Sequence, residues 1–119
     1  MPGRLSEEFR KRVKGYAAGV IRLFIKLPRQ RDEVQILGRQ LLRSATSVAA
    51  HLREASRARS GAEFVAKLGV ATQEADEASL WLELLREEGG VPPSLTVPLE
   101  KESSELIAIF TTMIKNTKP

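Results

Sequence analysis

The sequence contains no cysteine and only one histidine, one tryptophan and one tyrosine. Without cysteine, a disulfide framework, a thiolate metal site and a cysteine nucleophile are all excluded. A single imidazole leaves no convincing metal cluster, and it excludes an acid/base ribonuclease mechanism that needs two histidines. The lack of cysteine fits a reducing compartment, and we therefore expect a cytoplasmic protein.

Long hydrophobic runs are also missing. No segment approaches the roughly 20 uninterrupted apolar residues of a membrane span, so no membrane partner is expected. Charges on both sides of Phe9 leave no apolar core for a secretion signal. Aromatic residues make up only 5% of the chain, whereas Ala, Leu, Arg and Glu are abundant, and this composition favours helices over sheets.

Apolar residues recur every three or four positions in four segments, which is the period of an amphipathic α-helix. Prolines and glycines fall almost entirely between these segments, so local and global patterns agree. We predict one domain, residues 1–119, that folds as an all-α, antiparallel up-down-up-down four-helix bundle. The predicted helices span approximately residues 6–27, 33–58, 61–88 and 98–115.

Three of the predicted helices have a polar residue that can cap the amino end. Ser6 is the predicted cap of the first helix. Asp32 with Gln35, and Ser60 with Glu63, have the spacing of a capping box at the starts of the second and third helices.

Proline and glycine mark the predicted helix ends. Pro28 ends the first helix, because proline disfavours the helical conformation of the residue before it. Gly89 and Gly90 stop the third helix. Residues 91–98 contain three prolines and are predicted to form a connector before the fourth helix.

Charge is divided unevenly along the chain. Residues 1–67 carry 15 Lys and Arg against 6 Asp and Glu, whereas residues 68–119 carry 4 against 9. The amino-terminal half is therefore basic, at net +9, and the remainder is acidic, at net −5. Such a division fits a polyanionic partner, self-association between surfaces of opposite sign, or two solvated helix faces in one bundle.

Basic residues of the second predicted helix share a narrow stripe that lies almost opposite its apolar face. The stripe consists of Arg39, Arg43, Arg53 and Arg57, and the first helix can widen it with Arg10, Lys11 and Lys14. Guanidinium groups bind phosphate oxygens in a bidentate way. No aromatic residue alternates with these cations, so we expect recognition of nucleic-acid shape and backbone rather than stacked bases.

The third predicted helix separates its acidic residues from its apolar ones. Asp76, Glu77, Glu83 and Glu87 fall away from the apolar face on a helical projection. The sequence therefore predicts cleanly divided polar and apolar faces on both the second and the third helix.

A second group of polar residues borders the predicted core: Ser44, Ser47, His51, Glu54, Glu74 and Glu77. Ser44 or Ser47 with His51 superficially suggests a hydroxyl–imidazole pair, but no oxyanion hole or orienting third group accompanies it. The Glu-x-x-His pairs of dimetal bundles do not occur. We therefore predict structural hydrogen bonds, and interhelical or intersubunit pairs between these glutamates and arginines or His51. We predict no catalytic residue, metal or cofactor.

The central residues resemble a known bacterial family, the four-helix-bundle proteins encoded by intervening sequences of 23S rRNA genes. The similarity rests on the run 43–48 (RSATSV) and on Glu54-Ala55, Ser60, Glu63-Phe64, Lys67-Leu68, Glu74-Ala75, Glu77 and Trp81-Leu82-x-Leu84-Leu85. These residues cover about 50 positions. His51 departs from the family pattern, in which asparagine is usual.

This resemblance implies an antiparallel four-helix bundle that assembles as a homopentameric ring. It also implies distant similarity to the accessory protein of diversity-generating retroelements, which has a basic surface and associates with reverse transcriptase and nucleic acid. The family has no established enzymatic activity, and we predict that this chain is not an enzyme.

Two hypotheses follow from these patterns. In the first, an oligomeric bundle binds RNA or a nucleoprotein through the arginines of its first two helices. In the second, an assembly or adaptor protein has no nucleic-acid ligand, and its basic stripe meets the acidic third helix of a neighbouring subunit or a partner protein.

Overall fold

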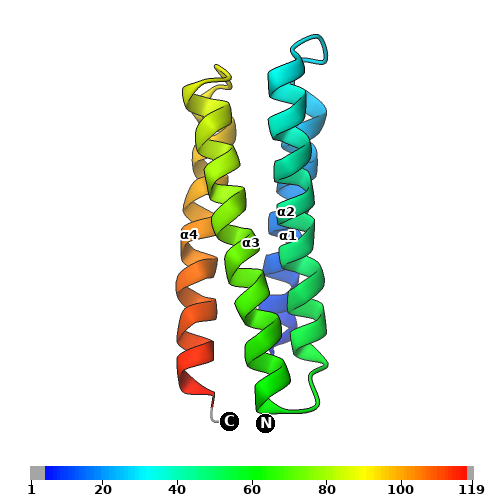
Figure 1. The fold of residues 1–119 in the computed structure, drawn as a ribbon, viewed down its shortest axis with the longest axis vertical. Helices are drawn as coiled ribbons and strands as arrows, with labels where there is room; N and C mark the ends of the chain where they lie inside the picture. The colour runs from blue at the N-terminus through cyan, green and yellow to red at the C-terminus, as the bar shows by residue number, and fades with distance from the viewer. Residues whose placement is uncertain (1–4, 118–119) are drawn as a thin grey trace.

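The computed structural model describes residues 5–117, which form four helices packed side by side (Figure 1). The ends of the predicted domain, residues 1–4 and 118–119, lie outside the described part of the chain. The bundle measures 48 × 20 × 19 Å. Its helices are α1 (Glu7–Lys26), α2 (Asp32–Ser56), α3 (Gly61–Glu87) and α4 (Pro93–Asn116).

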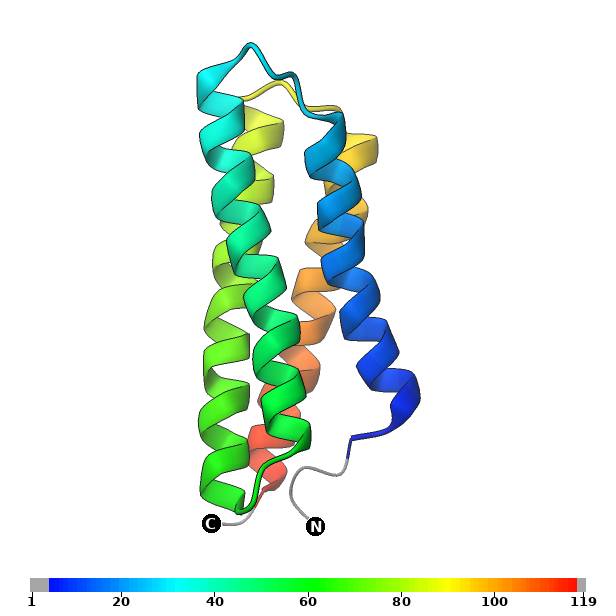
Figure 2. The ribbon, with the colours of Figure 1, turned by 90° about the vertical axis from the view of Figure 1, so that its right-hand side faces the viewer.

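Consecutive helices run in opposite directions and pack against each other, and α4 closes the ring against α1 (Figures 1 and 2). Short loops at residues 27–31, 57–60 and 88–92 join neighbouring helices. This arrangement confirms the predicted all-α, up-down-up-down bundle. None of the four described helices is both long and apolar enough to cross a membrane.

One apolar core runs along the bundle axis. Its largest fully buried aliphatic side chains come from all four helices: Val13, Val20, Val34, Leu41, Val48, Leu52, Leu68, Leu82, Leu85 and Leu106. Each such side chain contributes about 1.5–3 kcal/mol when it leaves water. Because most of the stability of helices in proteins comes from packing of their apolar faces, this shared core supplies most of the stability.

Polar contacts join α1 and α4. The packing between these two helices is the least extensive among the four pairs of adjacent helices. Arg12 donates two hydrogen bonds of 2.8 Å to the carboxylate of Glu102. Deeper in the interface, the Tyr16 and Ser103 hydroxyls lie 2.6 Å apart. Burial raises the pKa of Tyr16 to about 12, while its hydrogen bond to Ser103 acts in the opposite direction.

Two of the three predicted amino-terminal caps are confirmed. Ser6 accepts a hydrogen bond from the backbone of Phe9 at 3.0 Å, and Ser60 accepts one from Glu63 at 3.1 Å. The prediction for α2 is wrong, because Asp32 is already helical and Arg31 occupies the cap position without a side-chain hydrogen bond.

The start of α4 is a further correction. The helix begins at Pro93, five residues before the predicted start, and the supposed connector is largely helical. Proline is well suited to the first helical position, because its missing N–H would have no partner there. Pro98 is tolerated inside the helix on an exposed position, while Thr96 is fully buried and Leu99 packs against the core.

The predicted division of α2 and α3 into clean faces is also wrong in part. Ile36 on α2 is 57% exposed, and Leu80 on α3 is 46% exposed. Periodicity located the buried side of each helix, but it did not predict that large apolar side chains would also lie on the outside.

Candidate nucleic-acid interface

Five of the seven predicted cationic residues line one groove between α1 and α2. This basic groove has a volume of about 960 Å³. Val13, Ala49, Ala50 and Leu52 contribute its apolar lining, and Ser56 adds a hydroxyl. The cations are Arg10, Lys11 and Lys14 from α1, and Arg53 and Arg57 from α2.

Helical spacing explains how the two sides of the basic groove are built. Arg10 and Lys14 are four residues apart on α1, and Arg53 and Arg57 are four residues apart on α2. Residues at this spacing lie one above the other on the same helix face. Each helix therefore presents a short cationic column to the groove.

Two carboxylates also line the basic groove, but both have cationic partners. Glu7 lies 3.4 Å from Lys11, and Glu54 lies 2.8 Å from Lys67 on α3. The hydrogen bond from Lys67 lowers the pKa of Glu54, so this carboxylate stays ionised and engaged.

The remaining four cations of the groove carry its net positive charge. Within residues 5–117, Arg10, Lys14, Arg53 and Arg57 form no ion pair with a carboxylate. Their charges are therefore open to an anion from solution.

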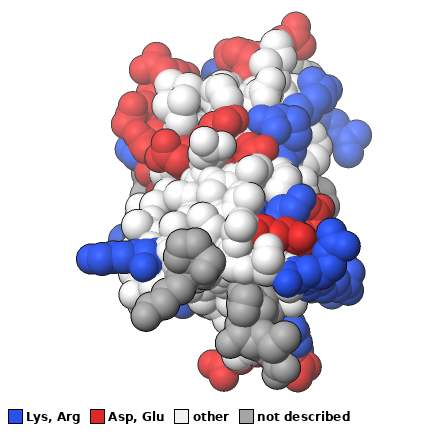
Figure 3. Space-filling model, turned by 60° about the horizontal axis from the view of Figure 1, so that its bottom comes forward, with Lys and Arg blue, Asp and Glu red and all other residues white. Residues whose placement is uncertain are grey.

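The face of the molecule drawn in Figure 3 shows the same division of charge. Basic side chains gather along the edge of the molecule formed by α1 and α2, at the right of Figure 3, with a few acidic ones among them. Acidic side chains gather mainly at the upper left, and a mostly uncharged area lies between the two. A polyanion would therefore approach along the α1–α2 edge.

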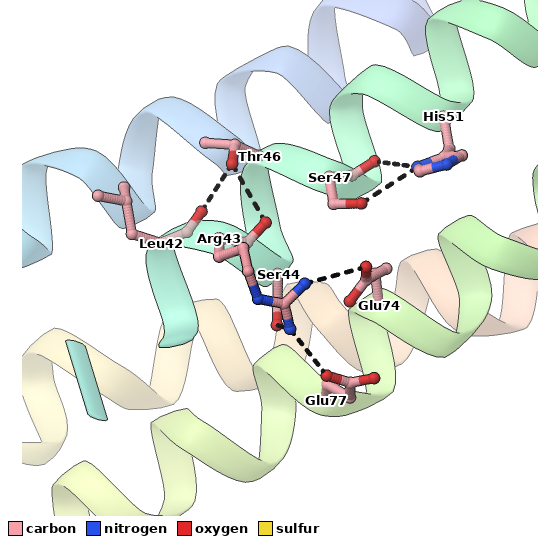
Figure 4. Close-up of polar contacts among 8 residues, drawn as sticks. All are labelled: Leu42, Arg43, Ser44, Thr46, Ser47, His51, Glu74 and Glu77. Carbon is pink, nitrogen blue, oxygen red and sulfur yellow. Dashed lines mark hydrogen bonds and ion pairs between the residues drawn. The ribbon is translucent and has the colours of Figure 1, made fainter. Parts of the chain in front are cut away.

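Arg43 belongs to the same arginine stripe, but it lies apart from the basic groove. Its guanidinium reaches across to α3, where it lies 3.3 Å from Glu74 and 3.1 Å from Glu77 (Figure 4). The structure thus brings together three of the predicted residues as an interhelical ion-pair cluster within a single chain. Glu54 pairs with Lys67 rather than with an arginine or His51.

Ser47 and His51, which superficially suggest a hydroxyl–imidazole pair, form a local contact within one helix. His51 Nδ1 lies 2.9 Å from the carbonyl oxygen of Ser47 and 3.1 Å from its hydroxyl, all on α2 (Figure 4). Ser44 is fully buried, and its hydroxyl accepts a long hydrogen bond of 3.4 Å from Arg43. Within residues 5–117, no group of three or more Asp, Glu or His side chains is placed to hold a metal ion.

Arg39, the last of the seven cations, lies in a second concavity at the other end of α1 and α2. This upper pocket has a volume of about 700 Å³. Its lining is Phe24, Arg29, Asp32, Gln35, Ile36 and Arg39. Phe24 is only half-buried, because it lies near the end of α1, where it packs against the edge of the core.

Taken together, the fold and the basic groove define an all-α bundle with a cationic seam between its first two helices. The sequence matches the family of 23S rRNA-intervening sequence proteins over residues 8–112, and the chain belongs to this family. The fold is also that of a Bacteroides thetaiotaomicron protein of unknown function from the S23 ribosomal protein family. That crystal structure has a TM-score of 0.82 and 31% identity, and the match covers 90% of this chain and 95% of that one. A search of curated proteins finds no match.

Proposed function

We propose that this chain is a non-enzymatic, oligomeric bundle protein that binds RNA, or the RNA of a nucleoprotein, through the basic groove. The observation that carries the proposal is the convergence of Arg10, Lys14, Arg53 and Arg57 from two helices on one concave surface, without ion pairs to carboxylates of the described chain. Phosphate contacts of this kind supply most of the affinity in sequence-independent binding.

The lining of the basic groove favours recognition of the backbone. Its uncharged residues are alanine, valine, leucine and one serine, Ser56, and none of its side chains is aromatic. Without an aromatic platform, bases gain little by stacking in this groove. A folded RNA that presents its phosphates at a fixed spacing is therefore the ligand class that the groove fits best.

Self-association is the second part of the proposal. Two observations support it: large apolar side chains, among them Leu80 and Ile25, remain exposed, and the family resemblance implies a ring of five copies. A ring would repeat the basic groove around its circumference, and repeated weak sites on one polyanion bind much more tightly than a single site.

Fluorescence anisotropy with a labelled RNA hairpin, measured across a salt series, tests the binding proposal. For the wild type, the logarithm of the affinity should fall steeply with the logarithm of the salt concentration, because bound phosphates release counterions. Arg53→Glu with Arg57→Glu should weaken binding by at least about ten-fold, and it should reduce the salt slope.

A matched variant distinguishes the effect of charges in the basic groove from the effect of the net charge of the protein. Arg22 and Arg59 are exposed and lie outside the basic groove, so Arg22→Glu with Arg59→Glu makes the same change in charge elsewhere. This control should keep most of the affinity. The proposal would be overturned if the wild-type protein did not bind RNA at low salt, or if both variants lost affinity for RNA equally. In the first case, a stable oligomer by native mass spectrometry would favour the adaptor hypothesis.

A further inference from the structure

The upper pocket combines an aromatic ring with two guanidinium groups, a combination that the basic groove lacks. Phe24 and Ile36 form its apolar part, and Arg29 and Arg39 contribute its positive charge. Within the described residues, neither arginine forms an ion pair with a carboxylate. Asp32 is the one carboxylate among the lining residues, so the pocket carries a net positive charge.

A glycine on α2 determines where the aromatic ring lies. A Cβ atom at Gly38 would lie 3.1 Å from Phe24 Cδ1 and only 2.6 Å from Leu27 Cδ1. The backbone of α2 is therefore in close contact with the end of α1. This contact holds Phe24 at the edge of the core, where its ring lines the upper pocket.

The chemistry of the upper pocket matches a nucleotide. Phe24 and Ile36 offer an apolar surface for a base, because every base has a π-face that stacks on an aromatic ring. Arg29 and Arg39 offer planar donors for the phosphate. Asp32 and the side-chain oxygen of Gln35, whose nitrogen already donates to Pro28, are acceptors for the amino groups of a base.

The upper pocket and the basic groove lie along the same pair of helices. Arg39 and Arg53 are fourteen residues apart on α2, which corresponds to about 21 Å along the helix axis. At ~3.4 Å per nucleotide, about six nucleotides of one strand span this distance. One RNA can therefore occupy both sites.

We propose that the upper pocket binds one unpaired nucleotide of the RNA whose backbone lies in the basic groove. The base stacks on Phe24 and packs against Ile36, and its phosphate lies between Arg29 and Arg39. This inference rests on the proposed function. It adds that the protein prefers RNA in which a base-paired stem continues into a single strand.

Two RNAs that differ in one feature test this inference. The first is a blunt hairpin with a stem of about ten base pairs, and the second is the same hairpin with a single-stranded extension of about six nucleotides. The wild type should bind the extended hairpin about five-fold or more tightly, the gain expected from stacking one base.

Variants of the upper pocket should remove this preference without abolishing binding of the blunt hairpin. Phe24→Leu removes the ring, and Arg29→Gln with Arg39→Gln removes the charges. Ile36→Glu places a carboxylate in the pocket at an exposed position, so its result does not depend on core packing. Each variant should reduce the preference to less than about two-fold. Arg22→Gln with Arg59→Gln, the matched control, should retain it.

The outcomes separate the two proposals. The inference would be overturned if the wild type bound the two hairpins with equal affinity, or if all upper-pocket variants kept the preference for the extended hairpin. Either result would leave the proposed role of the basic groove unchanged. A failure of both hairpins to bind would overturn the proposed function and this inference together.

Discussion

The guanidinium of Arg43 on α2 lies 3.3 Å from the carboxylate of Glu74 on α3, whose side chain is only 15% exposed. The same guanidinium lies 3.1 Å from Glu77, one helical turn further along α3. The second oxygen of Glu74 is buried without a hydrogen-bond partner. Arg43 is therefore the main compensation for a carboxylate that has little access to water.

Arg43→Gln should destabilise the bundle by about 1–2 kcal/mol, because it leaves the Glu74 carboxylate poorly solvated and without its cation. Arg39→Gln removes the same charge from an exposed position of the same helix and should change stability by less than about 0.5 kcal/mol. Urea denaturation of the three proteins measures both effects.

A second substitution checks the cause. Adding Glu74→Gln to the Arg43→Gln variant should recover part of the lost stability, since a neutral amide is less costly to bury than an unpaired carboxylate. Loss of stability that is the same with and without Glu74→Gln would contradict this account of Arg43.

The contrast between Arg39 and Arg43 shows how far the sequence could predict the site. Both residues belong to one arginine stripe, because a helical projection orders residues around one helix. The projection contains no information about the neighbouring helices. The side chain of Arg43 reaches the carboxylates of α3, whereas Arg39 lines the upper pocket beside α1. Which residues of a neighbouring helix a side chain contacts depends on how the helices pack. The sequence of one helix alone does not contain this information.

The fold was more predictable than the site for a related reason. Apolar residues that recur every three or four positions mark the buried side of a helix, and Val13, Tyr16 and Val20, which have this spacing on α1, are all buried. Local rules failed where tertiary contacts compete with them. Pro98 favoured a connector, but burial of Thr96 beside it and the packing of Leu99 favour a helix.

Any side chain at position 38 should destabilise the bundle. A Cβ atom there would lie 2.6 Å from Leu27 Cδ1 and 3.1 Å from Phe24, so Gly38→Ala should destabilise the bundle by about 1–3 kcal/mol through overpacking. Gly15 on α1 has open space around the same position, and Gly15→Ala should stabilise by about 0.5–1 kcal/mol. Thermal unfolding of the two variants should shift in opposite directions, and shifts of the same sign would contradict the proposed contact.

Pro98 interrupts the hydrogen-bond ladder of α4, because proline cannot donate to the carbonyl four residues earlier. Pro98→Ala should therefore stabilise the protein by about 1–2 kcal/mol, after allowing for the greater freedom of the unfolded chain. Pro93→Ala is the matched control, since proline suits the first helical position and its loss should give no gain. Equal effects of the two substitutions in urea denaturation would show that the missing hydrogen bond at Pro98 does not weaken the helix.

Tyr16 should make stability depend on alkaline pH. Its pKa is raised to about 12 in the folded state, above the ordinary value of 10.0, because burial disfavours the phenolate. A raised pKa means that the folded protein holds this proton more tightly than the unfolded chain does. The resulting stability, up to roughly 2–3 kcal/mol, is fully present below pH 10 and is lost as the pH rises through 12.

Tyr16→Phe isolates this contribution from that of the other groups that titrate in the same range. The variant loses the hydrogen bond to Ser103, but the Ser103 hydroxyl still donates to the carbonyl of Leu99 at 2.9 Å, so the loss near pH 8 should be about 1 kcal/mol. Between pH 10 and 12 the wild type should lose more stability than the variant, because phenylalanine has no proton to release. Urea denaturation at intervals across this range measures the difference, and parallel curves for the two proteins would show that Tyr16 ionisation does not limit alkaline stability.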